Sequence, residues 1–302
     1  MKAWAALKGE VGGRALRLIG DADTFRHAAK VSSIDTSALE GAIVSTKHRV
    51  RAEPGKPSSE NAKAVTDAIA EGVRACQAGE AAALVTAPIH KAVLTAAGFG
   101  FPGHTEYLAS LTGSPRAVMM LASRGLSPAL RVVPFTIHLP LKEVFAQLDA
   151  KAIAATGEIV LEALKADFGC ANPRLAVAGL NPHAGEDGTM GREDIEIVAP
   201  AVETLRNKQH SVSGPLAADT LFHDEARKLY DAALCMYHDQ ALIPIKTLAF
   251  WTGVNVTLGL PIVRTSPDHG TALSLAGRGI ANAASMIAAI EMAAEIADRR
   301  GL

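Results

Sequence analysis

Short apolar runs alternate with longer amphipathic stretches along the whole chain. This alternation is typical of βαβ units, in which helices cover a mostly parallel sheet. The apolar runs predict strands at residues 16–20, 82–87, 117–122, 130–137, 174–180, 232–237 and 255–260. The amphipathic stretches predict helices at residues 60–78, 141–167, 192–208 and 281–298. The pattern therefore predicts an α/β protein.

Local signals refine two of these helices. Ser58 and Ser59 are candidate N-caps for the helix at 60–78. Pro140 suits the first turn of the helix at 141–167, and Gly157 is a candidate break within it. The one loop rich in Pro and Ser is RAEPGKPSSE at 51–60. A division into domains is therefore expected to involve strands that cross between lobes, and not a flexible linker.

Composition excludes several classes of protein. The chain has 302 residues, which is enough for one large domain or two medium ones. A formal net charge of −1 leaves no electrostatic footprint for nucleic acid or an acidic membrane. No window holds the ~20 apolar residues that a membrane span needs. The three cysteines are far apart and form no Cys-x-x-Cys, so we expect buried thiols in a reducing cytoplasm.

Three histidines each lie where a predicted strand ends. They are His138 in PFTIHLPL, His183 in GLNPHAGE and His238 in MYHDQALIPIK. Strand ends are where open α/β sheets build ligand sites. Three imidazoles that converge there would bind a divalent metal and leave a coordination position open. The long gaps between them also allow the simpler interpretation of three unrelated loop histidines.

Other polar residues suit an anionic ligand. In FPGHTEYL, His104 and Thr105 could donate to a phosphate through a ring N–H, a hydroxyl and nearby amides, although Thr105 could equally be only an N-cap. Lys246 and Arg264 flank two largely apolar strands. Two cations near a metal site suit a phosphate ester or a carboxylate, while the alternative is that both are solvated surface charges.

Two glycine-rich segments carry further signals. LNPHAGEDGTMGRED could wrap a ligand, but it is neither a Walker loop nor a dinucleotide fingerprint. In SPDHGTALSLAGRGIANAA, small residues would let the backbone approach a flat ring or a pyrophosphate closely. Asp219, in GPLAADTLF, is either a carboxylate that orients a metal-bound histidine or a helix cap.

Taken together, these segments resemble the 4-hydroxythreonine-4-phosphate dehydrogenase family of pyridoxal phosphate biosynthesis. The resemblance runs from about Leu16 to the C-terminus. It is carried, in one order, by TAPIHKAVL, GHTEYL, TIHLPL, LNPHAGE with MGRE, GPLAADT, YHDQALIPIK and DHGTALSLAG.

The resemblance implies a role for each motif. The implied metal ligands are His138, His183 and His238. The implied substrate contacts are His104, Thr105, Lys246, Asn255 and Arg264. The implied cofactor loop, which would bind NAD or NADP, includes His269, Gly270, Thr271, Ala272 and Asn282. The metal would be Zn, Mg or Co. Asp219 and Asp239 are candidates for the general base near that metal.

The resemblance also implies an architecture. Two α/β/α domains would flank a cleft, as in the related isocitrate and isopropylmalate dehydrogenases, whose non-Rossmann fold would explain the missing fingerprint. Residues 1–106 with 252–302 would form the lobe that holds both termini and the cofactor loop. Residues 107–251 would form the metal-binding and dimerisation lobe. The metal site would be shared between the two subunits of a homodimer.

The implied reaction is a metal-dependent, NAD(P)-linked oxidation of 4-phosphooxy-L-threonine. Its 3-oxo acid product would decarboxylate to 3-amino-2-oxopropyl phosphate. One alternative is a sister dehydrogenase acting on threonate or erythronate 4-phosphate, or on a dihydrodiol. An alternative of another class is a non-redox phosphate-binding protein or a phosphate acyltransferase, which have a similar fold.

The chain departs from the family at its start. Family members usually begin with a strand and a loop that reads roughly Gly-Asp-Pro-Ala-Gly-Ile-Gly-Pro-Glu, whereas this sequence opens at KAWAALKG. That opening resembles the helix that would follow the loop. We therefore expect a recognisable fold that lacks the family's first strand.

Overall fold

The computed structural model describes residues 1–51, 53–101 and 103–302. The chain divides into two compact units. Unit 1 contains Met1–Ala117, Leu260–Asp298 and Leu302, and unit 2 contains Val118–Gly259 and Arg299–Gly301. Across the described residues, no helix combines the length and the apolar character that crossing a membrane requires.

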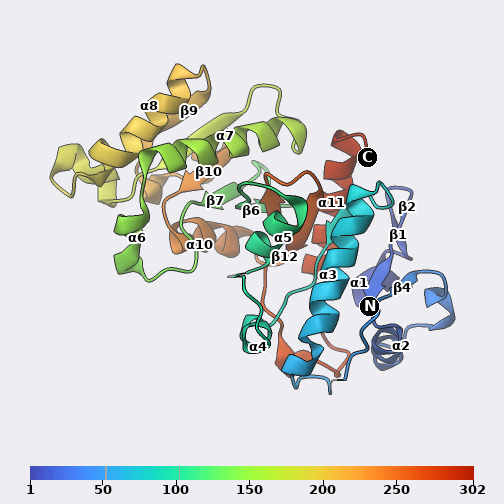
Figure 1. Ribbon diagram of the computed structural model, residues 1–302. Helices are drawn as coiled ribbons and strands as arrows, with labels where there is room; N and C mark the ends of the chain where they lie inside the picture. The colour runs from blue at the N-terminus through green and yellow to red at the C-terminus, as the bar shows by residue number, and fades with distance from the viewer. Residues whose placement is uncertain (52, 102) are drawn as a thin grey trace. The chain divides into compact units, whose positions relative to one another are not determined.

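Unit 1 mixes helices with short strands (Figure 1). Its helices are α1 (Lys2–Ala6), α2 (Ala22–Val31), α3 (Ala62–Gln77), α4 (Lys91–Ala96), α5 (His104–Thr112) and most of α11 (Ala284–Arg299). Its strands are β1 (Glu10–Val11), β2 (Arg14–Ala15), β3 (Leu18–Gly20), β4 (Ile43–Ser45), β5 (Ala83–Val85) and β12 (Val263–Pro267). The Ser58 hydroxyl accepts from the Glu60 amide and caps the short 3-10 turn Ser59–Asn61, whereas the N-cap of α3 itself is Asn61.

Two strand pairs organise unit 1. Strand β12 pairs in parallel with β5, with Arg264 opposite Leu84, and β3 pairs in parallel with β4. Leu84 packs in a cluster with Ile69 of α3 and Leu108 of α5. These apolar contacts fix the strand that carries Arg264 against the helix that begins at His104.

Unit 2 is built on a mixed sheet. Its strands are β6 (Val118–Ser123), β7 (Arg131–Pro134), β8 (Arg174–Ala178), β9 (Ser211–Leu216), β10 (Ala232–Cys235) and β11 (Gly253–Leu258). They run in the order β11-β6-β7-β10-β8-β9. Strands β7, β10, β8 and β9 are parallel to one another, whereas β6 is antiparallel to both β7 and β11. The expected mostly parallel order therefore holds for only part of this sheet.

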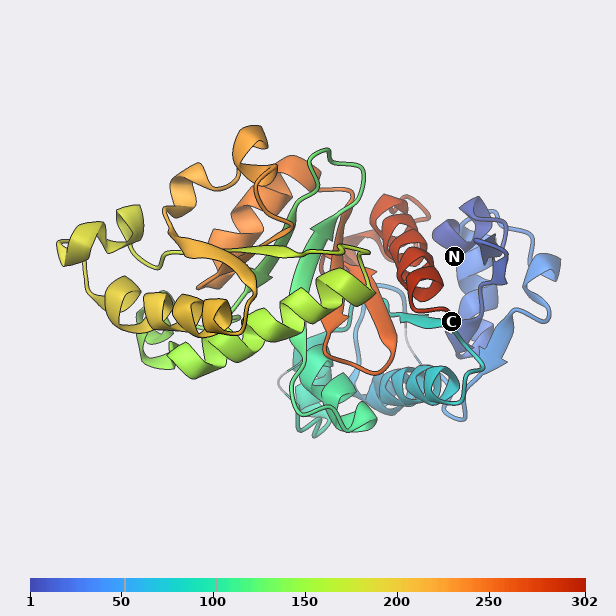
Figure 2. The same ribbon diagram turned by 90° about the horizontal axis from the view of Figure 1, so that it is seen from above.

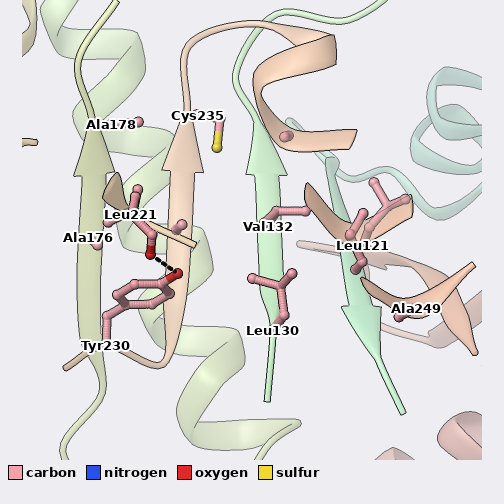
Figure 3. Packing of buried hydrophobic residues seen from close by; sticks show 12 residues of the cluster. Leu121, Leu130, Val132, Ala176, Ala178, Leu221, Tyr230, Cys235 and Ala249 are labelled. Atoms are coloured by element: carbon pink, nitrogen blue, oxygen red, sulfur yellow. Dashed lines mark hydrogen bonds between the residues drawn. The ribbon is translucent and has the colours of Figure 1, made fainter. Parts of the chain in front are cut away.

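Helices cover both faces of this sheet. They are α6 (Leu141–Gln147), α7 (Ala150–Ala166), α8 (Ala199–Asn207), α9 (Asp224–Arg227) and α10 (His238–Ala249). Helix α10 lies on the face opposite α7 (Figure 2). Figure 3 shows the core on the α10 side, where Ala176 and Ala178 of β8 pack with Val132 and Ala249. The two expected properties, an α/β class and a two-part chain, are confirmed.

The predicted single helix at 141–167 is wrong. Helix α6 ends before Leu148, whose φ of −74° and ψ of 126° are extended. Asp149 then caps α7 by accepting from the Ala152 amide at 2.8 Å. Gly157 does not break α7, which continues through it from Ala150 to Ala166. A Cβ at this position would lie 2.6 Å from a Leu205 methyl. The glycine is the residue that lets α7 pack closely on α8.

Candidate functional site

The three histidines of interest follow three neighbouring parallel strands of unit 2. His138 follows β7, His238 follows β10, and His183 follows β8. Strand β10 lies between the other two, with Ala233 opposite both Val132 and Ala176. Because parallel strands end at the same edge of a sheet, all three histidines are delivered to one edge.

His138 and His238 come together in a pocket. Their ring centroids are 5.6 Å apart, and the rings are inclined at 42°. The pocket has a volume of about 270 Å³ and is lined by Thr136, His138, Leu139, Leu141, Val144, Tyr237, His238 and Asp239. Two imidazoles at the mouth of a small pocket are a suitable pair of nitrogen donors for a divalent metal.

An acidic neighbour orients His238. The Nδ1 atom of His238 lies 2.7 Å from Oδ1 of Asp239. A carboxylate accepts only, so Nδ1 carries the proton and Nε2 keeps its lone pair. This carboxylate–histidine arrangement is the one that metal-bound imidazoles commonly show.

His183 lies apart from that pair. It is exposed and does not line the pocket. Within the residues that the structure describes, no group of three or more His, Cys, Asp or Glu side chains is placed to hold a metal. A single chain therefore brings together two of the three predicted ligands.

The segment that carries His183 has an unusual backbone. Residues 183–187 all have positive φ, from 41° to 82°, and only Gly185 among them is a glycine. His138 also has a positive φ, of 53°. Left-handed backbone costs roughly 1–2 kcal/mol for each non-glycine residue, so surrounding contacts must hold it in place.

Those contacts are provided by Asp194 and by glycines. Asp194 is 0% exposed and accepts from the amides of Leu180 at 2.7 Å and Asn181 at 3.0 Å. A Cβ at Gly179 would lie 2.8 Å from Ala184. Only a glycine therefore allows the left-handed turn to fold back onto the end of β8.

A second candidate site lies in unit 1. Nη2 of Arg264, which is 2% exposed, donates to Oγ1 of Thr86 at 2.6 Å and lies 3.2 Å from Nδ1 of His104. Burial, and then the Arg264 charge, lower the pKa of His104 to about 3. Burial also lowers the pKa of Arg264 to about 10, so at neutral pH the guanidinium is charged and the imidazole is neutral.

This geometry fixes the tautomer of His104. Nδ1 accepts from the guanidinium, so Nε2 carries the proton. That Nε2 atom is buried and has no hydrogen-bond partner within the described residues. A buried cation beside an unsatisfied N–H donor is suited to an anionic ligand such as a phosphate.

The other predicted substrate contacts lie elsewhere. Thr105 is in the first turn of α5, whose N-cap is Gly103, so the N-cap interpretation of Thr105 is wrong. Lys246 is half-buried on α10, with Nζ 5.7 Å from the centre of the Phe250 ring, so the expectation that it flanks a strand is also wrong. Asn255 lies in β11, and its Oδ1 is buried with no partner within the described residues.

The two candidate bases differ in their surroundings. Asp239 is exposed and contacts His238, as described above. Asp219 is exposed in the short helical turn Ala218–Thr220 and is not its cap, which is Ala217. Thr86 was not singled out by the sequence. Its position at the end of a predicted strand, beside His90 and Lys91, is the signal that could have found it.

The predicted cofactor loop lies in unit 1 and is open to solvent. His269, Gly270 and Ala272 are exposed, and Nδ1 of His269 donates to the Gly270 carbonyl at 2.8 Å. A Cβ at Gly277 would lie 2.8 Å from Cβ of Pro54, so the loop packs against Pro54. Asn282 caps α11 through the Ala284 amide. Exposed backbone near a helix start is suited to a nucleotide's phosphates.

The chain is thus an α/β protein with a buried Arg–His pair in one unit and histidines at strand ends in the other. Residues 14–293 match the model of a family described as pyridoxal phosphate biosynthetic protein PdxA. The chain belongs to this family.

Individual relatives are similar over most of their length. A 4-hydroxythreonine-4-phosphate dehydrogenase of Paracoccus denitrificans is 54% identical over 275 residues, covering 90% of this chain and 85% of the relative. One of Bradyrhizobium diazoefficiens is 55% identical, covering 89% and 78%. A crystal structure of the Klebsiella pneumoniae enzyme of the same name has a TM-score of 0.83 at 34% identity, covering 98% and 96%.

Proposed function

We propose that this protein is a 4-hydroxythreonine-4-phosphate dehydrogenase of pyridoxal phosphate biosynthesis. The observation that carries the proposal is the family match over residues 14–293, since relatives at 54–55% identity have this name. The substrate would be 4-phosphooxy-L-threonine. Its secondary alcohol is oxidised, and the resulting 3-oxo acid loses carbon dioxide to give 3-amino-2-oxopropyl phosphate.

His138 and His238 are the proposed metal ligands within one chain. Their rings lie close together, and Asp239 leaves Nε2 of His238 free to coordinate. A Zn, Mg or Co ion bound there would act as a Lewis acid that lowers the pKa of the substrate hydroxyl. Asp239 and Asp219 are the candidate acceptors of the hydroxyl proton.

The third ligand, His183, is proposed to come from a second copy of the chain. Exposed apolar side chains occur in the same segments as the histidines: Leu139, Leu141 and Phe145 follow His138, and Met190 and Ile195 follow His183. Apolar side chains of this kind are typical of a surface that a partner covers. A homodimer that buries them could also complete the metal site.

His104 and Arg264 are the proposed anchors of the substrate phosphate. The guanidinium supplies the charge and the neutral imidazole supplies an N–H donor, with Thr105 next to it on α5. Lys246 and Asn255 are proposed as further contacts from unit 2, on the resemblance alone. In this arrangement His104 would bind the phosphate, and other residues would bind the substrate amine and carboxylate.

NAD or NADP is proposed to bind unit 1 through His269, Gly270, Thr271, Ala272 and Asn282. The nicotinamide would accept the hydride that leaves the substrate carbon. The chain's own contribution is the exposed backbone of the loop and its close packing on Pro54. We also propose a cytoplasmic location, because the three cysteines are free in the structure.

A dehydrogenase assay tests the proposal. The protein is mixed with 4-phosphooxy-L-threonine, Zn²⁺, Mg²⁺ or Co²⁺, and NAD or NADP, and the absorbance of the reduced cofactor is followed. His138→Ala should abolish turnover, whereas His210→Ala, a half-buried histidine of the same unit, should not. Turnover of threonate or erythronate 4-phosphate or a dihydrodiol in its place would indicate a sister dehydrogenase. No cofactor reduction with any of them would refute a redox function.

A further inference from the structure

Three buried polar side chains join the ends of β7, β10 and β8. They are Thr136, Gln240 and Asp194, which are 6%, 8% and 0% exposed, and we call them the strand-end brace. Each makes its bonds with backbone groups near a histidine that follows one of the three strands. All three belong to unit 2.

Gln240 uses both ends of its amide. Its Oε1 accepts from the amide of Met236 at 2.7 Å, and its Nε2 donates to the carbonyl of Gly179 at 2.7 Å. Met236 lies two residues before His238, and Gly179 begins the loop that leads to His183. One side chain therefore fixes the distance between two histidine-bearing segments.

Thr136 and Asp194 extend this connection on either side. The Thr136 hydroxyl donates to the Met236 carbonyl at 2.8 Å, which ties the segment before His138 to the segment before His238. Asp194 holds the amides of Leu180 and Asn181 on the way to His183. The brace thus runs from the end of β7, through the end of β10, to the end of β8.

The two hydrogen bonds of Gln240 fix the orientation of its side-chain amide. Its oxygen faces a donor and its nitrogen faces an acceptor, so rotating the amide by half a turn would break both bonds. A buried group that satisfies two backbone partners resists displacement, because each partner would otherwise be left unpaired. The histidines themselves are exposed or partly exposed, and His138 and His183 have left-handed backbone. Their positions therefore depend on the buried groups beneath them.

We propose that Gln240 is a positioning residue for the metal-binding histidines, and that Thr136 supports it. This inference rests on the proposed function, because it assumes that these histidines bind a metal. Gln240 would not touch the metal or the substrate. It would fix the start of the helix that begins at His238, which serves the metal site of its own chain, and the loop that carries His183, which serves the site of the second copy.

Co²⁺ binding to the full-length protein tests this inference. Gln240→Met removes both hydrogen bonds while it keeps a similar volume, and we expect Co²⁺ to bind about 10–100-fold more weakly, with altered visible absorption. Tyr230→Phe is the matched control. Tyr230 is also buried and its hydroxyl donates to the Leu221 carbonyl at 2.9 Å, but it lies before β10, at the end opposite His238 (Figure 3).

The control separates positioning from general stability. We expect both variants to melt at a lower temperature than the wild type and only Gln240→Met to lose Co²⁺ affinity. If Gln240→Met binds Co²⁺ within twofold of the wild type, the inference is overturned and the side chain is only structural. If Gln240→Met does not fold, Thr136→Val and Thr136→Ser decide. Weaker binding in the valine variant with recovery in the serine variant supports the brace, and equal binding in both overturns it.

The same experiment distinguishes this inference from the proposed function. His238→Ala should abolish Co²⁺ binding if the metal site exists. If the wild type itself binds no Co²⁺, the metal site is refuted and the inference falls with it. If the wild type binds and His238→Ala does not, any result for Gln240→Met bears on the brace alone.

Discussion

Replacing His104 by Asn should make unit 1 less sensitive to acid. The native pKa of His104 is lowered to about 3 from 6.5, by burial first and then by Arg264. Between those values the unfolded state binds a proton that the native state does not, so stability falls as pH falls. The contribution of the neutral His104 to the free energy of unfolding is fully present above about pH 6.5. About pH 5 lies 1.5 pH units below the unfolded-state pKa of 6.5, so the free energy of unfolding has decreased there by about 2 kcal/mol.

Asn is suited to this test because its Oδ1 can still accept from the Arg264 guanidinium. Urea unfolding is measured at about pH 7 and about pH 5 in a Trp251→Phe background. Trp251 is exposed in unit 2, so its removal leaves Trp4, which is buried in unit 1, as the fluorescent probe. The wild type should lose about 2 kcal/mol more than His104→Asn between the two pH values. Equal losses would show that His104 titrates normally, and would refute the buried neutral imidazole.

Two further variants test the anion site and the packing of unit 2. Arg264→Lys replaces a guanidinium that contacts both Thr86 and His104 with a point charge. In steady-state kinetics KM for a phosphorylated substrate should rise by a factor equivalent to about 1.5–3 kcal/mol, and an unchanged KM would place Arg264 outside the site. Gly157→Ala should lower the free energy of unfolding by about 1–3 kcal/mol in urea titration, because the new Cβ would lie 2.6 Å from Leu205. A stabilised Gly157→Ala would mean that helix propensity outweighs this crowding.

Hydrophobic patterning predicted the buried strands because burial on both faces leaves an apolar run. All seven predicted strands occur in the structure, including β8, where Leu175 faces Gly157 and Ala176 faces the α10 side. Two of the missed strands are less apolar: β9 contains Ser211 and Ser213, and β12 contains Arg264. Strand β4 is apolar but has only three residues. Helix α10 was missed because Pro244 lies inside it, and proline argues against a helix interior.

The sequence predicts which site residues lie close together only where they follow neighbouring parallel strands. His138 and His238 follow adjacent parallel strands, so their proximity follows from topology. His183 follows a parallel strand of the same sheet, yet its left-handed loop directs it away from the pair, and no sequence periodicity encodes that turn. Gln240 lies within MYHDQALIPIK, but the sequence does not indicate that its amide is buried and bonds to two backbone groups.

In unit 2, left-handed backbone and the buried polar side chains that stabilise it occur at different depths. His138 and His183, which have left-handed backbone, follow strand ends, and both side chains are exposed. Gln240 and Asp194, which bond to backbone groups in the segment that leads to His183, are buried. A strained turn persists only if its surroundings stabilise it by more than the strain, and each buried bond to a backbone group contributes roughly 0.5–3 kcal/mol. Buried support of this kind holds the exposed histidines in one geometry. Catalytic sites require this preorganisation of their side chains.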